Sequence, residues 1–183
     1  MSKPQSMASR KFLAAVCSVT LSLSLASLAL AQSTEQPSQC GPAQVYFDVK
    51  TSHPTQTPPA KPDAGKALIY FLQDDSSFPL RPRPTTRFVV DGAWIGATHA
   101  NSYFFVSVDP GVHHLCAEWQ SYGFGRKAAA AHFVAEPGGV YYMVAENTGT
   151  RGFVKLSFGP ADSDEALLLM KDFSLSTSHS KKQ

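Results

Sequence analysis

Short apolar segments separated by turn residues dominate the chain from residue 43 onward. Residues 87–119 show this pattern best, because runs rich in Val, Ile and aromatic residues are interrupted by Asp91-Gly92 and by Pro110-Gly111. Strand-sized runs on either side of such dipeptides predict β-hairpins. We therefore expect two successive hairpins, with a wider or bulged turn at Pro110-Gly111, since Pro followed by Gly favours a type II turn that splays the strands.

The second expected hairpin assigns its side chains to two faces. If Val108 pairs with His113, the alternation of side chains along each strand gathers the more apolar set on a core face. This set comprises Phe104, Val106, Val108, His113, Leu115, Ala117 and Trp119. The opposite, mixed face then carries Tyr103, Phe105, Ser107, His114, Cys116 and Glu118. A slip of one residue in the pairing would exchange the two sets.

Other apolar runs predict strands at residues 43–49, 67–72, 127–135, 140–146 and 153–158. The continuous run 67–72 is typical of a strand that is buried on both faces. Four consecutive alanines in the run 127–135 favour a helix in isolation. We interpret it as a strand, because the flanking glycines and proline leave room for only about ten residues. Residues 73–86, between the run 67–72 and the hairpin segment 87–119, are interpreted as a loop.

One helix is indicated near the C-terminus. Asp162 or Ser163 can cap it, and Asp164, Glu165 and Lys171 suit the two ends of its dipole. Its apolar positions, which would pack on a sheet, are Ala166, Leu167, Met170 and Phe173. These elements predict an all-β domain, an antiparallel β-sandwich of about seven to nine strands with one C-terminal helix.

The N-terminus has the features of a secretory signal peptide. Basic residues precede the apolar run 12–31, which ends in a small-residue pattern that favours cleavage after Ala31. A run of about 20 residues could also act as an uncleaved membrane anchor. The many serines in this run and the small residues at its C-terminal end favour cleavage instead. Cys17 follows Val16 early in the run, which does not suit lipid attachment.

The domain organisation follows from these segments. We expect a signal peptide at 1–31 and an N-terminal segment at 32–65 with the first strand and a proline-rich linker. The sandwich with its helix should occupy 66–173, and the polar residues 174–183 should form a disordered tail.

Charge and cysteine content change once the signal peptide is removed. Of the 16 basic residues, three lie in the signal peptide, which leaves 13 against 14 acidic residues. A nucleic-acid-binding surface is therefore disfavoured. Two cysteines remain, and an even number in an exported chain predicts a disulfide between Cys40 and Cys116, with two free thiols as the alternative. It would fasten the N-terminal segment to the mixed face of the central strands.

Candidate functional residues are few. Trp94, Tyr122 and Phe124 lie near turns, where exposed rings could stack on sugars or receive a partner's side chain, although core positions are the more common explanation for such aromatic residues. The serines lack a nucleophile elbow, so we expect no catalytic residues. Neighbouring His113 and His114 point to opposite faces of a strand and cannot readily chelate one metal together.

A metal site or enzyme remains an alternative. His99 or His132 could join one of the adjacent histidines, but no H-x-x-x-H or C-x-x-C motif is present, so we expect neither a metal nor a cofactor. The alternative enzyme would be a periplasmic hydrolase or metal-dependent enzyme that uses His113 or His114 with Glu118 or Asp109. Such acid/base chemistry depends on a geometry that the sequence does not define.

Several motifs in residues 66–169 fall on Leu68-Ile69-Tyr70-Phe71, Asp91-Gly92, Ile95-Gly96, Pro110-Gly111, His113 and Tyr141-Tyr142. This pattern resembles an uncharacterised bacterial family of exported proteins and lipoproteins, a domain of unknown function. The central part also resembles the small β-domains of the PEGA type. Most of these positions are turn glycines and core residues, so the resemblance implies a fold rather than a chemistry.

The function expected from the sequence is a non-enzymatic exported binding or structural module of the bacterial cell envelope. Its location would be periplasmic or secreted, without a lipid anchor and without a stable membrane span after cleavage. The expected partner is an envelope protein or a polysaccharide.

Overall fold

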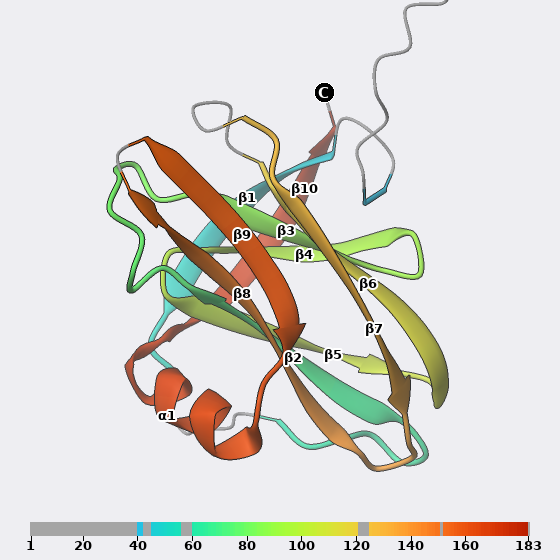
Figure 1. Ribbon diagram of the computed structural model, residues 1–183. Helices are drawn as coiled ribbons and strands as arrows, with labels where there is room; N and C mark the ends of the chain where they lie inside the picture. Colours follow the sequence, from blue (N-terminus) through green and yellow to red (C-terminus); the bar gives the residue numbers. More distant parts are fainter. Residues whose placement is uncertain (1–39, 42–44, 56–59, 121–124, 151, 183) are drawn as a thin grey trace, which may run out of the picture. The chain divides into compact units, whose positions relative to one another are not determined.

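The computed structural model describes residues 40–41, 45–55, 60–120, 125–150 and 152–182. Within these residues the chain forms ten strands and one helix (Figure 1). The elements are β1 (Val45–Ser52), β2 (Ala67–Asp74), β3 (Thr85–Val90), β4 (Ala93–His99), β5 (Ser102–Val108), β6 (Gly111–Trp119), β7 (Ala128–Ala135), β8 (Val140–Thr150), β9 (Phe153–Pro160), α1 (Ser163–Asp172) and β10 (Ser174–Lys182). The predicted signal peptide lies outside the described residues.

The strands form two sheets. The six-stranded sheet has the order β1-β10-β5-β2-β8-β9 and the four-stranded sheet has the order β4-β3-β6-β7. The four-stranded sheet is antiparallel throughout, whereas the six-stranded sheet is mixed, because β2 runs parallel to β8 and β10 runs parallel to β5. The predicted β-rich sandwich with a C-terminal helix is confirmed, with one strand more than expected and with two parallel pairs.

The first predicted hairpin is confirmed. β3 and β4 pair in antiparallel fashion around Asp91 and Gly92, which have φ angles of 49° and 81°. Positive φ at both central residues is the requirement of the two-residue turn that fits the twist of a hairpin, and Asp-Gly satisfies it.

The second predicted hairpin is wrong. β5 pairs with β2 and β10, whereas β6 pairs with β3 and β7, so the chain crosses between the sheets after Val108. Gly111 has a φ of 138° at this crossing, a conformation that side chains disfavour. Crossing places the apolar sides of the two strands opposite each other across the core, where a hairpin would have placed them side by side in one sheet.

The predicted core face of these strands is nevertheless correct, because alternation along a strand does not depend on the pairing partner. The cluster between the sheets contains Phe104 and Val108 from one sheet and Leu115, Ala117 and Trp119 from the other. Val106 packs against it, and His113 is 9% exposed. The sandwich core is therefore built from side chains contributed by both strands.

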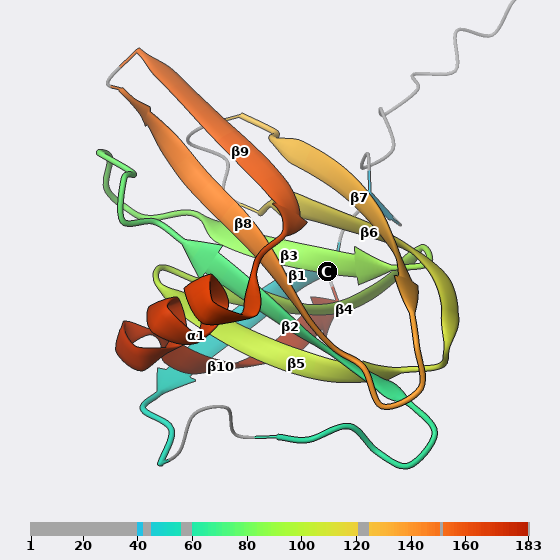
Figure 2. The same ribbon diagram turned by 60° about the horizontal axis from the view of Figure 1, so that its bottom comes forward.

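β2 is buried on both faces, as its continuous apolar run predicts. Ala67, Ile69 and Phe71 point into the core between the sheets. Leu68, Tyr70 and Leu72 belong to a second cluster with Ala166, Met170 and Phe173, the residues expected to fasten the helix. Figure 2 shows α1 beside the six-stranded sheet, on the face turned away from the main core. Asp162 caps the helix, its side chain accepting a hydrogen bond from the Asp164 amide.

The prediction of a disordered tail at 174–183 is wrong. Ser174–Lys182 forms β10, which pairs with β1 over eight residues and with β5 over two. The polar sequence is misleading because backbone hydrogen bonds to β1 hold this strand, and they require no apolar side chains. The alanine-rich segment 127–135 forms a strand, β7, as predicted. In the described part of the chain, no helix is long and apolar enough to cross a membrane.

Candidate functional site

A groove runs between β4 and the β1–β10 ribbon. It has a volume of about 570 Å³ and is lined by Val45, Phe47, Trp94, Ile95, Ser178, His179 and Ser180, a set that we call the β4–β10 groove. A second hollow of about 300 Å³ shares Ile95 and Ser178 with it and continues along β10. Among the described residues that line either hollow, none is Lys, Arg, Asp or Glu. The surface thus combines apolar side chains, hydroxyl groups and one indole.

β10 forms one wall of this groove because it parts from β5 after a short contact and stays paired with β1. It pairs with β5 only at Ser174 and Leu175 and then continues beside β4 together with β1. The Ser178 hydroxyl accepts a hydrogen bond of 3.0 Å from the Ala97 amide. The Ser178 side chain therefore satisfies a backbone amide at the edge of β4 that would otherwise bond to a neighbouring strand. The space beside this edge of β4 stays open.

Trp94, one of the three predicted ligand-binding residues, lies in the groove. Its indole is half-buried, and the guanidinium of Arg87 lies 4.3 Å from the ring centre, a cation–π contact. Gly41 packs so closely that an added Cβ would lie 3.1 Å from Cε2 and Nε1 of the indole. The ring is thus held from two sides. The other two predicted residues, Tyr122 and Phe124, lie outside the described residues.

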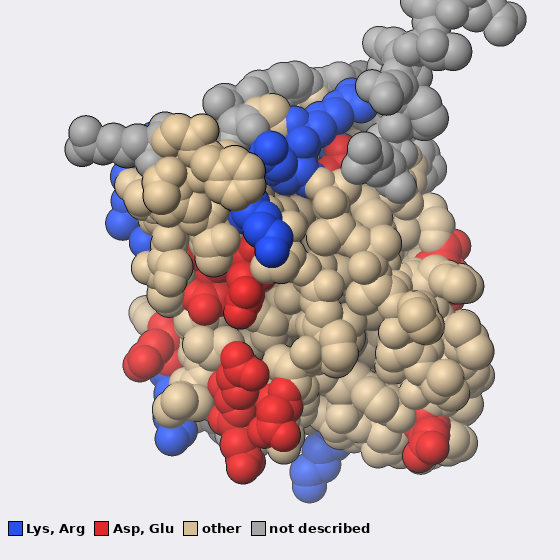
Figure 3. All heavy atoms as spheres, in the orientation of Figure 1, with Lys and Arg blue, Asp and Glu red and all other residues tan. Residues whose placement is uncertain are grey.

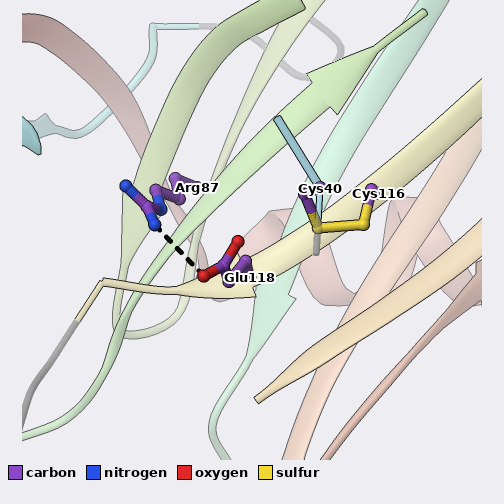
Figure 4. The surroundings of a disulfide bond; sticks show 4 residues. All are labelled: Cys40, Arg87, Cys116 and Glu118. Atoms are coloured by element: carbon purple, nitrogen blue, oxygen red, sulfur yellow. Dashed lines mark hydrogen bonds and ion pairs between the residues drawn. A yellow bond between two sulfur atoms is a disulfide. The ribbon is translucent and has the colours of Figure 1, made fainter. Parts of the chain in front are cut away.

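Arg87 connects the indole to a buried ion pair. Its Nη2 lies 3.2 Å from Oε1 of Glu118, and the two side chains are 9% and 1% exposed (Figure 4). Arg87 stands directly opposite Glu118 in the register of β3 and β6. Its Nη1 also donates a hydrogen bond to the Val45 carbonyl oxygen. The start of β1 therefore covers this ion pair on the side of the four-stranded sheet that faces away from the main core.

The predicted disulfide between Cys40 and Cys116 is present, with 5.4 Å between the Cα atoms. Cys116 lies two residues before Glu118 on the same face of β6, so the bridge joins the N-terminal segment to the sheet beside the ion pair (Figure 4). As expected, it fastens that segment to the mixed face. The bridge and the Arg87 contacts together fix the region on which Trp94 rests.

Gln120 fastens the outer edge of β1. Its side-chain amide accepts a hydrogen bond of 2.6 Å from the Phe47 amide and donates one of 2.9 Å to the Phe47 carbonyl oxygen. This two-way contact imitates a neighbouring strand and satisfies an edge that would otherwise be open to pairing with another chain. The β1 wall of the groove is therefore secured from both sides, by β10 and by Gln120.

The residues of the alternative enzyme are brought together only in part. His113 Nδ1 lies 2.6 Å from Asp91 Oδ2, and its Nε2 lies 2.7 Å from the backbone carbonyl oxygen of Asp109. The Asp109 carboxylate instead pairs with Lys66 at 2.8 Å. Glu118 lies on the other face of β6 and pairs with Arg87. His113 thus ties the turn between β3 and β4 to the crossing before β6.

Two pKa shifts follow from this contact. Burial disfavours the charged imidazole, but hydrogen bonds to the Asp109 carbonyl and the Asp91 carboxylate outweigh it, and the pKa of His113 is raised. The pKa of Asp91 is lowered, chiefly by the hydrogen bond from the His114 amide, and also by His113. Both shifts favour the charged pair.

Sequence reasoning missed a buried polar network in the segment interpreted as a loop. Asp75 is fully buried, and it accepts hydrogen bonds from Gln73 Nε2 at 3.0 Å and from Asn147 Nδ2 at 2.6 Å. Asn147 in turn accepts a 2.7 Å bond from the indole of Trp119. Arg83 approaches the Asp75 carboxylate at 3.8 Å. Burial raises the pKa of Asp75 despite these donors.

One signal in the sequence could have found this network. Gln73 and Asp75 follow directly on the most continuously apolar run of the chain, a position at which polar side chains remain near the core. The partners Trp119 and Asn147 are distant in the sequence and come together only through the pairing of β2 with β8 and the facing of the two sheets.

Acidic and basic side chains form small separate groups on the face seen in Figure 3.

Comparison of the chain with models of protein families, with curated proteins and with solved structures found no match. The assignment of function therefore rests on the residues of the chain itself.

Proposed function

We propose that this protein is a non-enzymatic exported binding module of the bacterial cell envelope, and that the β4–β10 groove is its binding surface. The observation that carries the proposal is the position of Trp94, a half-buried indole that lines a groove and is backed by Arg87 and Gly41. An aromatic ring held in place before binding loses little freedom on contact with a ligand.

The lining chemistry favours an uncharged, hydroxyl-rich ligand, and we propose a neutral polysaccharide of the envelope. An indole face receives the apolar face of a sugar ring, while Ser178, Ser180 and His179 offer hydrogen-bonding groups. The lack of charged residues in the lining disfavours a strongly anionic polymer.

Export is supported by the disulfide, since such bonds persist in oxidising compartments. The sequence pattern of residues 1–31 gives the same indication. Membership of the uncharacterised exported family that the sequence resembles remains part of this proposal. Three of the four residues named for the alternative enzyme, His113, Glu118 and Asp109, have separate ionic partners in Asp91, Arg87 and Lys66, in support of a non-enzymatic role; the fourth is His114.

Tryptophan fluorescence tests the proposal directly. The chain has two tryptophans, and Trp119 is only 2% exposed, so a ligand in the groove should alter mainly the emission of Trp94. Soluble neutral oligosaccharides prepared from envelope polysaccharide would be titrated into the mature protein. We expect saturable changes, and Trp94→Phe and His179→Ala should each weaken binding, measured by calorimetry, by about tenfold.

Phe153→Ala provides the matched control, because Phe153 is a 67% exposed aromatic residue on β9 and does not line the groove. This variant should bind like the unmodified protein. Binding that is insensitive to Trp94→Phe and His179→Ala, or an absence of binding across the neutral oligosaccharides, would contradict the proposal.

A further inference from the structure

Two histidines stand directly opposite each other on the outer face of the four-stranded sheet. His114 of β6 and His132 of β7 are register partners, and both are exposed. Neighbouring His113 points into the protein and contacts Asp91, so it does not belong to this surface. The sequence suggested His132 only as one possible partner of His113 or His114, because 18 positions separate His114 from His132 (132 minus 114) and their pairing depends on strand register.

The hydrogen-bond pattern of the two strands brings these side chains close. The Trp119 amide donates to the Lys127 carbonyl oxygen at 2.9 Å, which makes Trp119 and Lys127 a hydrogen-bonded pair. Hydrogen-bonded and non-hydrogen-bonded pairs alternate along an antiparallel ladder. His114 and His132 lie five positions from Trp119 and Lys127, an odd number, so they form a non-hydrogen-bonded pair. In such pairs the Cβ atoms lie about 4.5–5.5 Å apart, the closest cross-strand spacing.

We propose that His114 and His132 form a surface site for a divalent transition-metal ion. Imidazole nitrogens bind such ions at about 2.0–2.1 Å, and two imidazoles from adjacent Cβ atoms can converge on one ion. Neither side chain has a hydrogen bond or an ion pair within the described part of the chain, so no protein contact need be broken. Copper(II) should bind most tightly, followed by zinc(II) or nickel(II).

The surroundings of the pair suit a cation. The next residues on the same face are Val112 and Val134 on one side and Cys116 and Ala130 on the other, and none of them is positively charged. The Asp91 carboxylate, whose Oδ2 pairs with His113, accepts a hydrogen bond at Oδ1 from the His114 amide at 2.9 Å, so a carboxylate lies near the site.

The ion would have two protein ligands. Among the described residues, no group of three or more His, Cys, Asp or Glu side chains could hold a metal together. Water, or a group supplied by a partner, would complete the coordination. Such an open site is accessible from solvent and should exchange its ion readily.

Calorimetric titration of copper(II) and zinc(II) chloride into the untagged mature protein tests the site. We expect one equivalent to bind and either His114→Ala or His132→Ala to weaken binding by at least about tenfold. His53→Ala is the matched control, since His53 is exposed beyond the end of β1 and has no strand partner. It should leave the affinity unchanged.

Electron paramagnetic resonance of the copper(II) complex supplies a second readout. The spectrum should show coupling to two imidazole nitrogens in the unmodified protein and to fewer in each single variant. Because both side chains are exposed, the variants should keep their circular dichroism spectra. Unchanged affinity in both single variants, or an equal loss in His53→Ala, would overturn the proposal.

Discussion

Arg87 and Glu118 face each other across β3 and β6 as an ion pair of 3.2 Å, almost completely enclosed beneath the start of β1. An enclosed pair depends on both partners, because removal of one leaves the other as an uncompensated buried charge. The pair also supports Trp94 through the Arg87 guanidinium, so its loss should affect both the stability and the groove.

Replacement of Glu118 by Ala is therefore expected to lower the free energy of unfolding by about 3–5 kcal/mol, measured by urea denaturation. Asp109→Ala is the control, because it breaks the exposed pair with Lys66 and should change stability little. The double variant Arg87→Met/Glu118→Leu should recover much of the loss, since it leaves no unpaired charge. Equal stability of Glu118→Ala and the unmodified protein would contradict this account.

The disulfide should contribute stability and protect Trp94. Replacement of Cys40 and Cys116 by Ser is expected to cost about 2–5 kcal/mol, because the unfolded chain regains the freedom that the bridge removes. The N-terminal segment around Gly41 should also loosen, and the emission of Trp94 should shift to longer wavelength as its ring meets water. Peptide mapping without reducing agent that finds both thiols free in the folded protein would refute the bridge.

Asp75 should make stability depend on pH. Its folded-state pKa lies above the ordinary value of 3.8, so the folded protein binds a proton more tightly than the unfolded chain does. The contribution of Asp75 to stability is therefore largest below that ordinary value and is lost as pH rises through the raised pKa. The stability of the unmodified protein relative to Asp75→Asn should increase on acidification from about pH 7 to about pH 4. A constant difference in urea denaturation across this range would show that the pKa is not raised.

Truncation tests the role of the last strand. Deletion of residues 174–183 removes β10, the strand partner of β1, and one wall of the β4–β10 groove. We expect a loss of cooperative unfolding or a large fall in the melting temperature. Deletion of residues 181–183 alone removes two of the eight register pairs between β10 and β1, at Val45 and Tyr46, and the exposed Lys181–Asp48 pair, so it should lower stability far less. A disordered tail would have predicted no effect from either deletion.

Alternation and turn chemistry made much of the fold predictable. Asp91-Gly92 defined its hairpin, and the apolar run of β2 indicated burial on both faces, because both signals are local. The crossing between β5 and β6 could not be predicted, since a strand's own alternation is the same whichever strand it pairs with. β10 was missed because its order comes from backbone contacts to a strand at the other end of the domain.

The candidate site was predictable only in fragments. Trp94 and the disulfide were identified from residue type and number, but the partners of Trp94 were not. Arg87 lies seven positions before it, and Gly41 lies much further away in the sequence. The Asp75 network and the His114–His132 pair likewise depend on strand register, which is set by long-range packing.

The pairing of β1 with β10 also constrains the order in which the protein can fold. β1 is the first strand of the described chain to be synthesised and β10 the last, so β1 waits unpaired until the C-terminal residues have emerged. A fold closed by its two ends cannot be completed step by step from the N-terminus, and contacts so distant in sequence slow the search for the native state. Under the export proposed above, β1 would stay unpaired until β10 had also crossed the membrane, so the domain would close only after both strands had been translocated.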